Sequence, residues 1–176
     1  MLVIIGPSAS GKTQIVSHLI KDYNMKKMVT YTTRPMRVGE VDGVDYHFIT
    51  TEDFKEKQAN DFFLETVCYN NNYYGTAKNS LSSDKVVILE SEGLKTYIKN
   101  ARDQIKIVFV RCSKEIRRIR MGIRGDNIES INKRLLSDDV HFNNEIMKLA
   151  DFVVDSSNSN NYDDAKKVYN FYEKFM

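Results

Sequence analysis

One stretch near the start of the chain, from Gly6 to Thr13, constrains the fold more than any other. It reads G-P-S-A-S-G-K-T and matches the pattern G-x-x-x-x-G-K-[ST]. It directly follows the apolar run Leu2–Ile5, and apolar residues at helical spacing come after it. A strand, a glycine-rich turn and a helix in this order direct backbone N–H groups toward a bound polyphosphate. The pattern predicts a phosphate-binding loop in an α/β fold, with an ordinary structural glycine turn as the alternative.

This loop is expected to bind ATP, and two of its side chains have particular roles. Lys12 adds a full positive charge near the β- and γ-phosphates, and the hydroxyl of Thr13 is offered to Mg²⁺. The acid that usually supports the metal follows another parallel strand, and Glu90 stands directly after the apolar run 86–89. An exposed acid at a strand end is the alternative for Glu90. The residues expected at ATP are Gly6, Pro7, Ser8, Ala9, Ser10, Gly11, Lys12 and Thr13.

Four short apolar runs, rich in branched residues, are typical of strands that are buried on both faces of a parallel sheet. Segments with helical spacing separate them, and at 176 residues the chain suits a single domain. One helix is expected from about Tyr162, and another with Asp126 as its N-cap and Glu129 as the capping partner. The prediction is a three-layer P-loop α/β fold around a central parallel sheet. The apolar runs lie at 2–5, 86–89, 105–110 and 152–154.

Two regions interrupt the alternation of strands and helices. Residues 32–80 are rich in Tyr, Phe, Asn and Thr, with a strand-like stretch at 46–49 and a short helix after Thr51, and we interpret them as an inserted subdomain. Residues 114–142 begin with a dense basic stretch and are interpreted as a helical lid, with a solvated basic surface as the alternative. The core would then comprise residues 1–31, 81–113 and 143–176.

Composition limits the classes of partner. The chain has 26 basic and 24 acidic residues, a formal net charge of +2, which argues against a nucleic-acid partner. Cys68 and Cys112 lie far apart without neighbouring ligand residues, so neither a disulfide framework nor a zinc site is predicted. No stretch has the length and character of a signal peptide or a membrane span. We expect a cytoplasmic protein without a membrane partner.

Several motifs follow the phosphate-binding loop. The first, T-Y-T-T-R-P-M-R at 30–37, places the guanidinium groups of Arg34 and Arg37 three residues apart, which suits one phosphate monoester. The others are G-E-V-D-G-V-D-Y at 39–46, F-L-E at 63–65, Y-Y-G-T at 73–76, R-M-G-I-R at 120–124 and S-I-N-K-R at 130–134. In this order, over nearly the whole chain, the sequence resembles guanylate kinase.

The resemblance implies that ATP and GMP are the substrates, that Mg²⁺ is the cofactor and that the inserted subdomain binds GMP. A carboxylate such as Glu65 accepts hydrogen bonds from both guanine N1–H and the 2-amino group, whereas adenine would leave it unpaired. A surface acid is the alternative for Glu65, and ordinary packing is the alternative for the tyrosines. The residues that the resemblance places at GMP are Thr30, Arg34, Arg37, Tyr46, Glu65, Tyr74, Thr76 and Glu92. Those expected to be catalytic are Lys12, Arg37, Arg120, Arg124 and Arg134, and the metal is expected at Thr13 and Glu90.

Two segments depart from the family pattern. Glu90-Ser91-Glu92 runs directly into Gly93, which makes the segment beside the guanine shorter by two residues. Asp155-Ser156 stands where the family tends to have Asn-Asp near the adenine. Two other functions therefore stay open: a related kinase for another small phosphate acceptor, such as a sugar phosphate, and a non-catalytic module that binds a phosphorylated peptide. Whichever of these functions holds, we expect the protein to be a monomer or a weak homo-oligomer.

Overall fold

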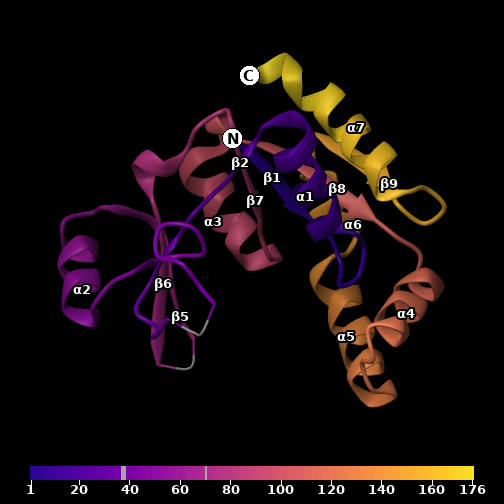
Figure 1. Cartoon of the computed structure of the whole chain (residues 1–176), viewed down its shortest axis with the longest axis horizontal. Coiled ribbons are helices and arrows are strands. Elements are labelled where there is room, and N and C mark those ends of the chain that lie inside the picture. Colours follow the sequence, from indigo (N-terminus) through magenta and orange to yellow (C-terminus); the bar gives the residue numbers. More distant parts are fainter. Residues whose placement is uncertain (37–38, 70) are drawn as a thin grey trace.

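The computed structural model describes residues 1–36, 39–69 and 71–176. Within these ranges, five parallel strands form the central sheet, in the spatial order β2-β7-β1-β8-β9 (Figure 1). They are β1 (Leu2–Ile5), β2 (Lys26–Lys27), β7 (Lys85–Ile88), β8 (Lys106–Arg111) and β9 (Phe152–Asp155). β1 lies in the middle and pairs with β7 on one side and β8 on the other. The predicted central parallel sheet is confirmed.

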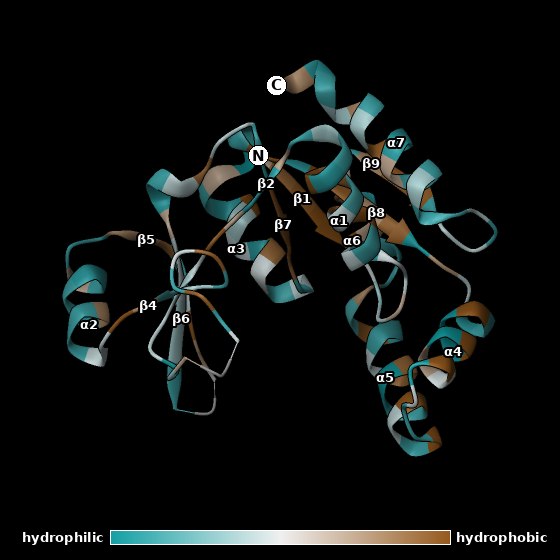
Figure 2. Cartoon of the chain, in the orientation of Figure 1, coloured by the Kyte–Doolittle hydropathy of each residue, from teal (hydrophilic) through white to brown (hydrophobic). Residues whose placement is uncertain are grey.

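Helices cover both faces of this sheet. They are α1 (Lys12–Tyr23) and α7 (Asn161–Tyr172) on one face, and α3 (Ser91–Ala101) and α6 (Asn144–Lys148) on the other. Successive residues of a strand point to opposite sides, so Leu2 and Ile4 are buried against α1 and α7, whereas Val3 and Ile5 are buried against α3 and α6. Figure 2 shows β1 and β8 as hydrophobic strands between these helices. The predicted three-layer arrangement is confirmed.

A second, smaller sheet has four strands in the order β4-β3-β6-β5 within the described residues. They are β3 (Tyr31–Thr32), β4 (His47–Phe48), β5 (Phe63–Tyr69) and β6 (Asn72–Ala77). β5 and β6 are antiparallel, and Phe63 pairs with Ala77 while Glu65 pairs with Thr76, so that Leu64 is the extra residue of a β-bulge. Gly75 is required in β6, because a Cβ there would lie 2.9 Å from Cδ1 of Phe63.

Helix α2 (Thr51–Ala59) packs on this smaller sheet (Figure 1). It begins after Thr50, whose side chain accepts a hydrogen bond from the backbone N–H of Asp53. The sequence predicts a helix at this place. Its residue Phe54 is fully buried and stacks on Phe63, with ring centroids 4.4 Å apart. This aromatic pair joins the helix to the sheet.

Two helices project from the core as an arm, α4 (Lys114–Ile123) and α5 (Ile128–His141), at the lower right of Figure 1. Met121, Ile131 and Leu135 form a small buried cluster between them, and Ala9 of the phosphate-binding loop packs against it. The prediction that Asp126 caps the second helix is wrong. The cap is Asn127, whose side chain accepts a hydrogen bond from the N–H of Ser130, because this side chain is the one placed at the helix start.

The sequence does not predict β2, because both of its residues are exposed lysines and no apolar run marks it. In the described part of the chain, three short 3₁₀ helices complete the fold: η1 (Lys78–Ser80), η2 (Arg102–Gln104) and η3 (Glu173–Phe175). Among the helices of the described ranges, none combines the length and the apolar character that crossing a membrane requires.

Candidate active site

The phosphate-binding loop connects β1 to α1, and glycines make its path possible. Gly6 has a φ of 142°, and a Cβ at this position would lie 2.4 Å from the backbone oxygen of Val110 in β8. Gly11, with a φ of 101°, directly precedes α1. Both residues adopt backbone conformations that L side chains rarely take. The loop is therefore built against β8 and leads into the N-terminus of α1, as the motif predicts.

Lys12 lies over this loop. Its Nζ donates hydrogen bonds to the backbone oxygens of Gly6, at 2.6 Å, and Pro7, at 2.8 Å. Burial lowers the pKa of Lys12 from its ordinary value, while the carboxylates of Glu90 and Asp138 act in the opposite direction. The ammonium group is thus held at the loop by two carbonyl oxygens and two nearby acids.

Two of the three predicted lid arginines lie at the phosphate-binding loop. Arg120 of α4 donates from Nη2 to the backbone oxygen of Ser156, at 2.8 Å, and from Nη1 to that of Ala9, at 3.2 Å. Arg124, at the end of α4, lines a small recess together with residues 9–14. Arg134 of α5 lies apart from the loop in this arrangement, more than half exposed and paired with Asp126 at 3.1 Å.

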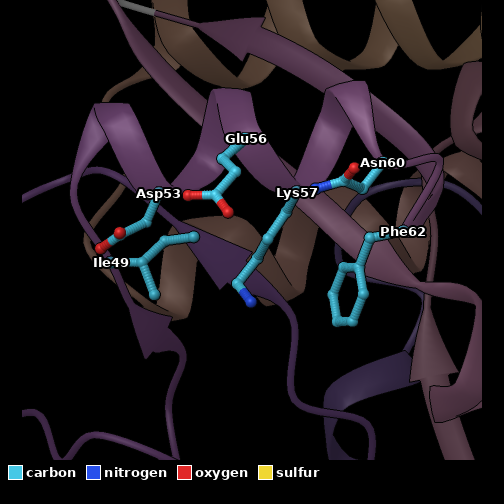
Figure 3. Close-up of a pocket in the computed structure, with 6 residues that line it drawn as sticks. All are labelled: Ile49, Asp53, Glu56, Lys57, Asn60 and Phe62. Carbon is cyan, nitrogen blue, oxygen red and sulfur yellow. The ribbon is translucent and has the colours of Figure 1, made fainter.

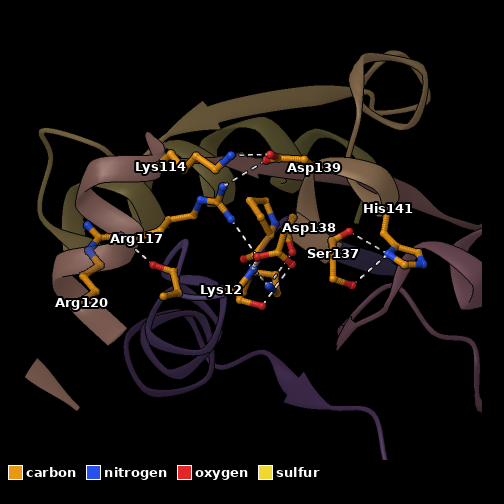
Figure 4. A network of polar contacts seen from close by, with 12 residues as sticks. Lys12, Lys114, Arg117, Arg120, Ser137, Asp138, Asp139 and His141 are labelled. Atoms are coloured by element: carbon orange, nitrogen blue, oxygen red, sulfur yellow. Dashed lines mark hydrogen bonds and ion pairs between the residues drawn. The ribbon is translucent and has the colours of Figure 1, made fainter. Parts of the chain in front are cut away.

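A buried polar network that the sequence does not predict joins the loop to the arm (Figure 4). Asp138 of α5 accepts hydrogen bonds from the backbone N–H of Ser8, at 3.0 Å, and from its hydroxyl, at 3.1 Å. Arg117 of α4 donates to the same carboxylate from Nη1, at 2.8 Å. Both charged side chains are less than a tenth exposed. Arg117 belongs to the basic stretch that the sequence shows, but its burial depends on Asp138, which lies 21 residues away.

A cavity of about 700 Å³ lies between the phosphate-binding helix α1, the end of β7 and the smaller sheet. This volume is within the usual range for small-molecule sites. Glu90 is among its lining residues, two positions beyond the end of β7 and directly before α3. Seven of the predicted site residues line this one cavity: Thr13, Thr30, Tyr46, Glu65, Tyr74, Thr76 and Glu90.

Glu65 carries the most distinctive chemistry in this cavity. Its Oε1 accepts a hydrogen bond of 2.9 Å from the hydroxyl of Thr76 on the paired strand. Burial raises the pKa of Glu65, and the Thr76 hydrogen bond opposes this shift because it stabilises the ionised form. Thr76 also accepts a hydrogen bond of 2.9 Å from the hydroxyl of Tyr97 on α3. Sequence reasoning missed Tyr97, because its helical spacing indicates burial and says nothing of its partner.

The remaining predicted acceptor residues lie outside the lining of this cavity or outside the described residues. Arg34 pairs with Glu40 at 2.6 Å, and its guanidinium lies 5.5 Å from the ring centroid of Tyr46, which does line the cavity. Glu92 is largely exposed near the start of α3 and pairs with Lys95 at 2.7 Å. Arg37 is outside the described residues.

A separate depression on the outer side of α2 has a different character (Figure 3). It is lined by Asp53, Glu56 and Lys57 together with Ile49, Asn60 and Phe62. The Nζ of Lys57 lies 4.8 Å from the ring centroid of Phe62, so the apolar ring is partly covered by a cation. We assign no site here, since charges of both signs on an open helix face are typical of a solvated surface.

Comparison with known proteins gives consistent results. The family model described as guanylate kinase matches residues 1–171. The guanylate kinase of Hydrogenovibrio crunogenus is 38% identical over 154 residues, which are 81% of this chain and 75% of that protein. A guanylate kinase of Clostridium perfringens is 41% identical over 145 residues, 78% of this chain and 67% of that protein. The crystal structure of guanylate kinase from Anaplasma phagocytophilum has a TM-score of 0.66 at 22% identity, covering 99% of this chain and 84% of that one.

Proposed function

Because this chain belongs to the guanylate kinase family, we propose that it is an enzyme that transfers the γ-phosphoryl group of ATP to GMP, giving ADP and GDP. The family supports this reaction in general terms. The observation that carries it for this chain is the single cavity that joins the phosphate-binding end of α1, at Thr13, to the carboxylate of Glu65. The chemistry is a direct in-line attack of a GMP phosphate oxygen on the γ-phosphorus, without a covalent enzyme intermediate.

On the donor side, catalysis depends on holding the ATP phosphates in position and on neutralising their charge. The loop N–H groups and the N-terminus of α1 bind the phosphates, and Lys12 neutralises charge that develops as the phosphoryl group moves. Arg120 and Arg124 already lie at the loop, so they need little movement to reach a bound phosphate. Arg134 completes the set only if the arm, residues 114–142, closes over the site.

The residues at the loop fit a magnesium ion, because oxygen donors from two elements line the same cavity. Thr13 supplies a hydroxyl and Glu90 a carboxylate. Mg²⁺ usually keeps several waters and substrate phosphate oxygens, so two protein ligands suffice. When bound, the ion neutralises phosphate charge and orients the transferring group.

On the acceptor side, the phosphate oxygens of GMP are already ionised near neutral pH, so the reaction needs no general base. Glu65 accepts the guanine N1–H and 2-amino donors, and Tyr46 and Tyr74 in the same cavity bind the phosphate. Arg34 lies against Tyr46, and we assign it to the same phosphate, which requires its ion pair with Glu40 to open. The inserted subdomain, residues 32–80, acts as the second moving part.

Glu92, which the resemblance places at the guanine, is largely exposed, so the main alternative, a kinase for another small phosphate acceptor, needs a direct test. A coupled assay of ADP formation against GMP, dGMP, AMP, UMP and several sugar phosphates tests the proposal. GMP and dGMP should be phosphorylated far faster than the others. Faster turnover of a sugar phosphate would contradict the GMP assignment, and ADP formation with none of the acceptors would favour a binding module.

A further inference from the structure

We propose that Tyr97 is a positioning residue for guanine recognition, because its hydroxyl fixes Thr76 and Thr76 in turn fixes the carboxylate of Glu65. Tyr97 itself does not line the cavity, whereas Thr76 and Glu65 do. It acts from the opposite side, from a helix of the core. The inference rests on the proposed function, since it assigns the selectivity of the same site to a residue that does not touch the substrate.

The direction of the hydrogen bonds follows from counting protons. An ionised carboxylate can only accept hydrogen bonds, so the Thr76 hydroxyl must donate its single proton to Oε1 of Glu65, at 2.9 Å. The Tyr97 hydroxyl must then donate to Thr76 Oγ1, also at 2.9 Å. The sulfur of Met28, at 3.8 Å, is a weaker acceptor for the same proton. The chain therefore runs one way, from the core toward the cavity.

Burial makes this arrangement rigid. Tyr97 is fully buried and Thr76 is 1% exposed, so water does not compete for either hydroxyl. The same helix, α3, also holds the neighbouring strand, because Nδ2 of Asn100 donates to the backbone oxygen of Leu64 at 2.9 Å. One core helix thus contacts β6 through Tyr97 and β5 through Asn100. Helix α3 therefore fixes the relative positions of the two strands that carry Thr76 and Glu65.

This arrangement matters for a two-donor base. Guanine offers N1–H and the 2-amino group side by side, so both hydrogen bonds form only if the plane of the Glu65 carboxylate is set. Thr76 occupies one lone pair of Oε1 and leaves the others for the base. Without the Tyr97 hydroxyl, Thr76 has lost the donor that orients it. Recognition of a base with one donor, such as hypoxanthine, should suffer less than recognition of guanine.

The test compares two buried tyrosines. Tyr97→Phe removes the hydroxyl from the relay. Tyr172→Phe is the matched control: Tyr172 is 1% exposed and its hydroxyl also makes a hydrogen bond, of 2.8 Å to the backbone oxygen of Ser83, but it lies in the cluster on the other face of the sheet. We expect Tyr97→Phe to raise the KM for GMP about tenfold, which corresponds to about 1.4 kcal/mol. The kcat and the KM for ATP should change less than about twofold, and the preference for GMP over IMP should fall.

A double-variant cycle separates positioning from a loss of folding. Thr76→Val cuts the relay with Tyr97 intact, so adding Tyr97→Phe to it should not raise the KM for GMP further. If Tyr97→Phe raised that KM equally with and without Thr76, or no more than Tyr172→Phe does, the inference would be overturned while the proposed function stood. Failure of the wild-type enzyme to phosphorylate GMP would overturn the proposed function and the inference together. Melting temperatures of all variants, read without nucleotide, report the purely structural cost.

Discussion

The carboxylate of Asp138 and the backbone N–H of Ser8 form a hydrogen bond of 3.0 Å that joins helix α5 to the phosphate-binding loop. Asp138 is placed there by Arg117, whose Nη1 lies 2.8 Å from the same carboxylate. The Nε of Arg117 is also buried and has no hydrogen-bond partner among the described residues. The arm and the loop thus meet at a buried ion pair.

Removing one partner of this ion pair should lower the stability more, per residue changed, than replacing both partners. Removing one partner leaves a buried charge without its ion-pair partner, so Arg117→Leu and Asp138→Leu should each lower the free energy of unfolding by about 3–5 kcal/mol. The double variant should be more stable than the sum of the two single losses predicts, because it removes both buried charges together, although it still loses the two hydrogen bonds that Ser8 donates to Asp138. Urea unfolding followed by circular dichroism measures this. Lys148→Met, which breaks an exposed pair with Glu145 outside this network, serves as the control and should cost at most about 1 kcal/mol. A double variant as unstable as the sum of the singles would contradict this account.

Lys12→Ala should suppress phosphoryl transfer while leaving the fold intact. The ammonium group stabilises charge that grows in the transition state, so we expect kcat to fall by about 100-fold or more. Initial rates of ADP formation measure the loss, and the circular dichroism spectrum verifies the fold. Lys26→Ala is a suitable control, since Lys26 is exposed in β2 and pairs with Asp84. Near-normal turnover of a folded Lys12→Ala enzyme is incompatible with the mechanism.

Glu65→Gln should lower the preference for guanine. The substitution keeps the size of the side chain but replaces one acceptor oxygen with an NH₂ donor, which then faces a guanine donor. The loss should be about 2–4 kcal/mol, or about 30- to 1000-fold in kcat/KM for GMP. Activity with AMP should change little or rise, because AMP never made these bonds. An unchanged ratio of GMP to AMP activity would show that another residue reads the base.

The pH dependence of GMP use should report Glu65. Burial raises the pKa of this carboxyl above its ordinary value. The ionised form is the one that accepts both guanine donors, so kcat/KM for GMP should fall as the pH falls through the raised pKa, earlier than an exposed glutamate would titrate. Glu65→Gln should remove this acid limb. The limb should be absent with AMP as acceptor, and its presence there would assign it to a different group.

Binding of both nucleotides should compact the molecule. GMP would join the core to residues 32–80, and ATP would join it to residues 114–142, so each ligand closes a different part. We expect the radius of gyration from small-angle scattering to decrease more with GMP and a non-hydrolysable ATP analogue together than with either alone. Superimposable profiles with and without both ligands would argue against closure.

Local signals predicted much of the fold. The branched apolar runs identify β1, β7, β8 and β9 as strands, but burial on both faces is wrong for β9, which is an edge strand whose Val153 is 40% exposed. The short helix expected after Thr51 is α2. β2 escaped prediction because two exposed lysines form a strand only through pairing with β7. The cap at Asn127 escaped because Asp126 offers an equally good capping side chain, and only the backbone path decides between adjacent candidates.

The residues of the candidate site likewise fall into those that local motifs predicted and those that were missed. Residues within contiguous motifs, such as Glu65 and Thr76, were predicted together, and the structure places both at the same cavity. Arg117 and Asp138 were missed because neither belongs to a motif and each is explained only by the other. Tyr97 was missed for a similar reason, since its partner Thr76 lies on a strand of the smaller sheet. Pairwise relationships between distant segments are absent from local patterns.

The β-bulge at Leu64 makes the length of β5 as important as its composition. Leu64 packs in the core cluster that contains Tyr97, and the next residue, Glu65, reaches the hydroxyl that Tyr97 contacts. Two consecutive side chains serve the same side only because the strand carries one extra residue. Deleting Leu64 would restore strict alternation and leave Glu65 opposite Thr76, because Phe63 already pairs with Ala77, the neighbour of Thr76. A β5 shorter by one residue would therefore keep the carboxylate on the cavity side but would lose the Leu64 side chain, which packs this strand on the core cluster.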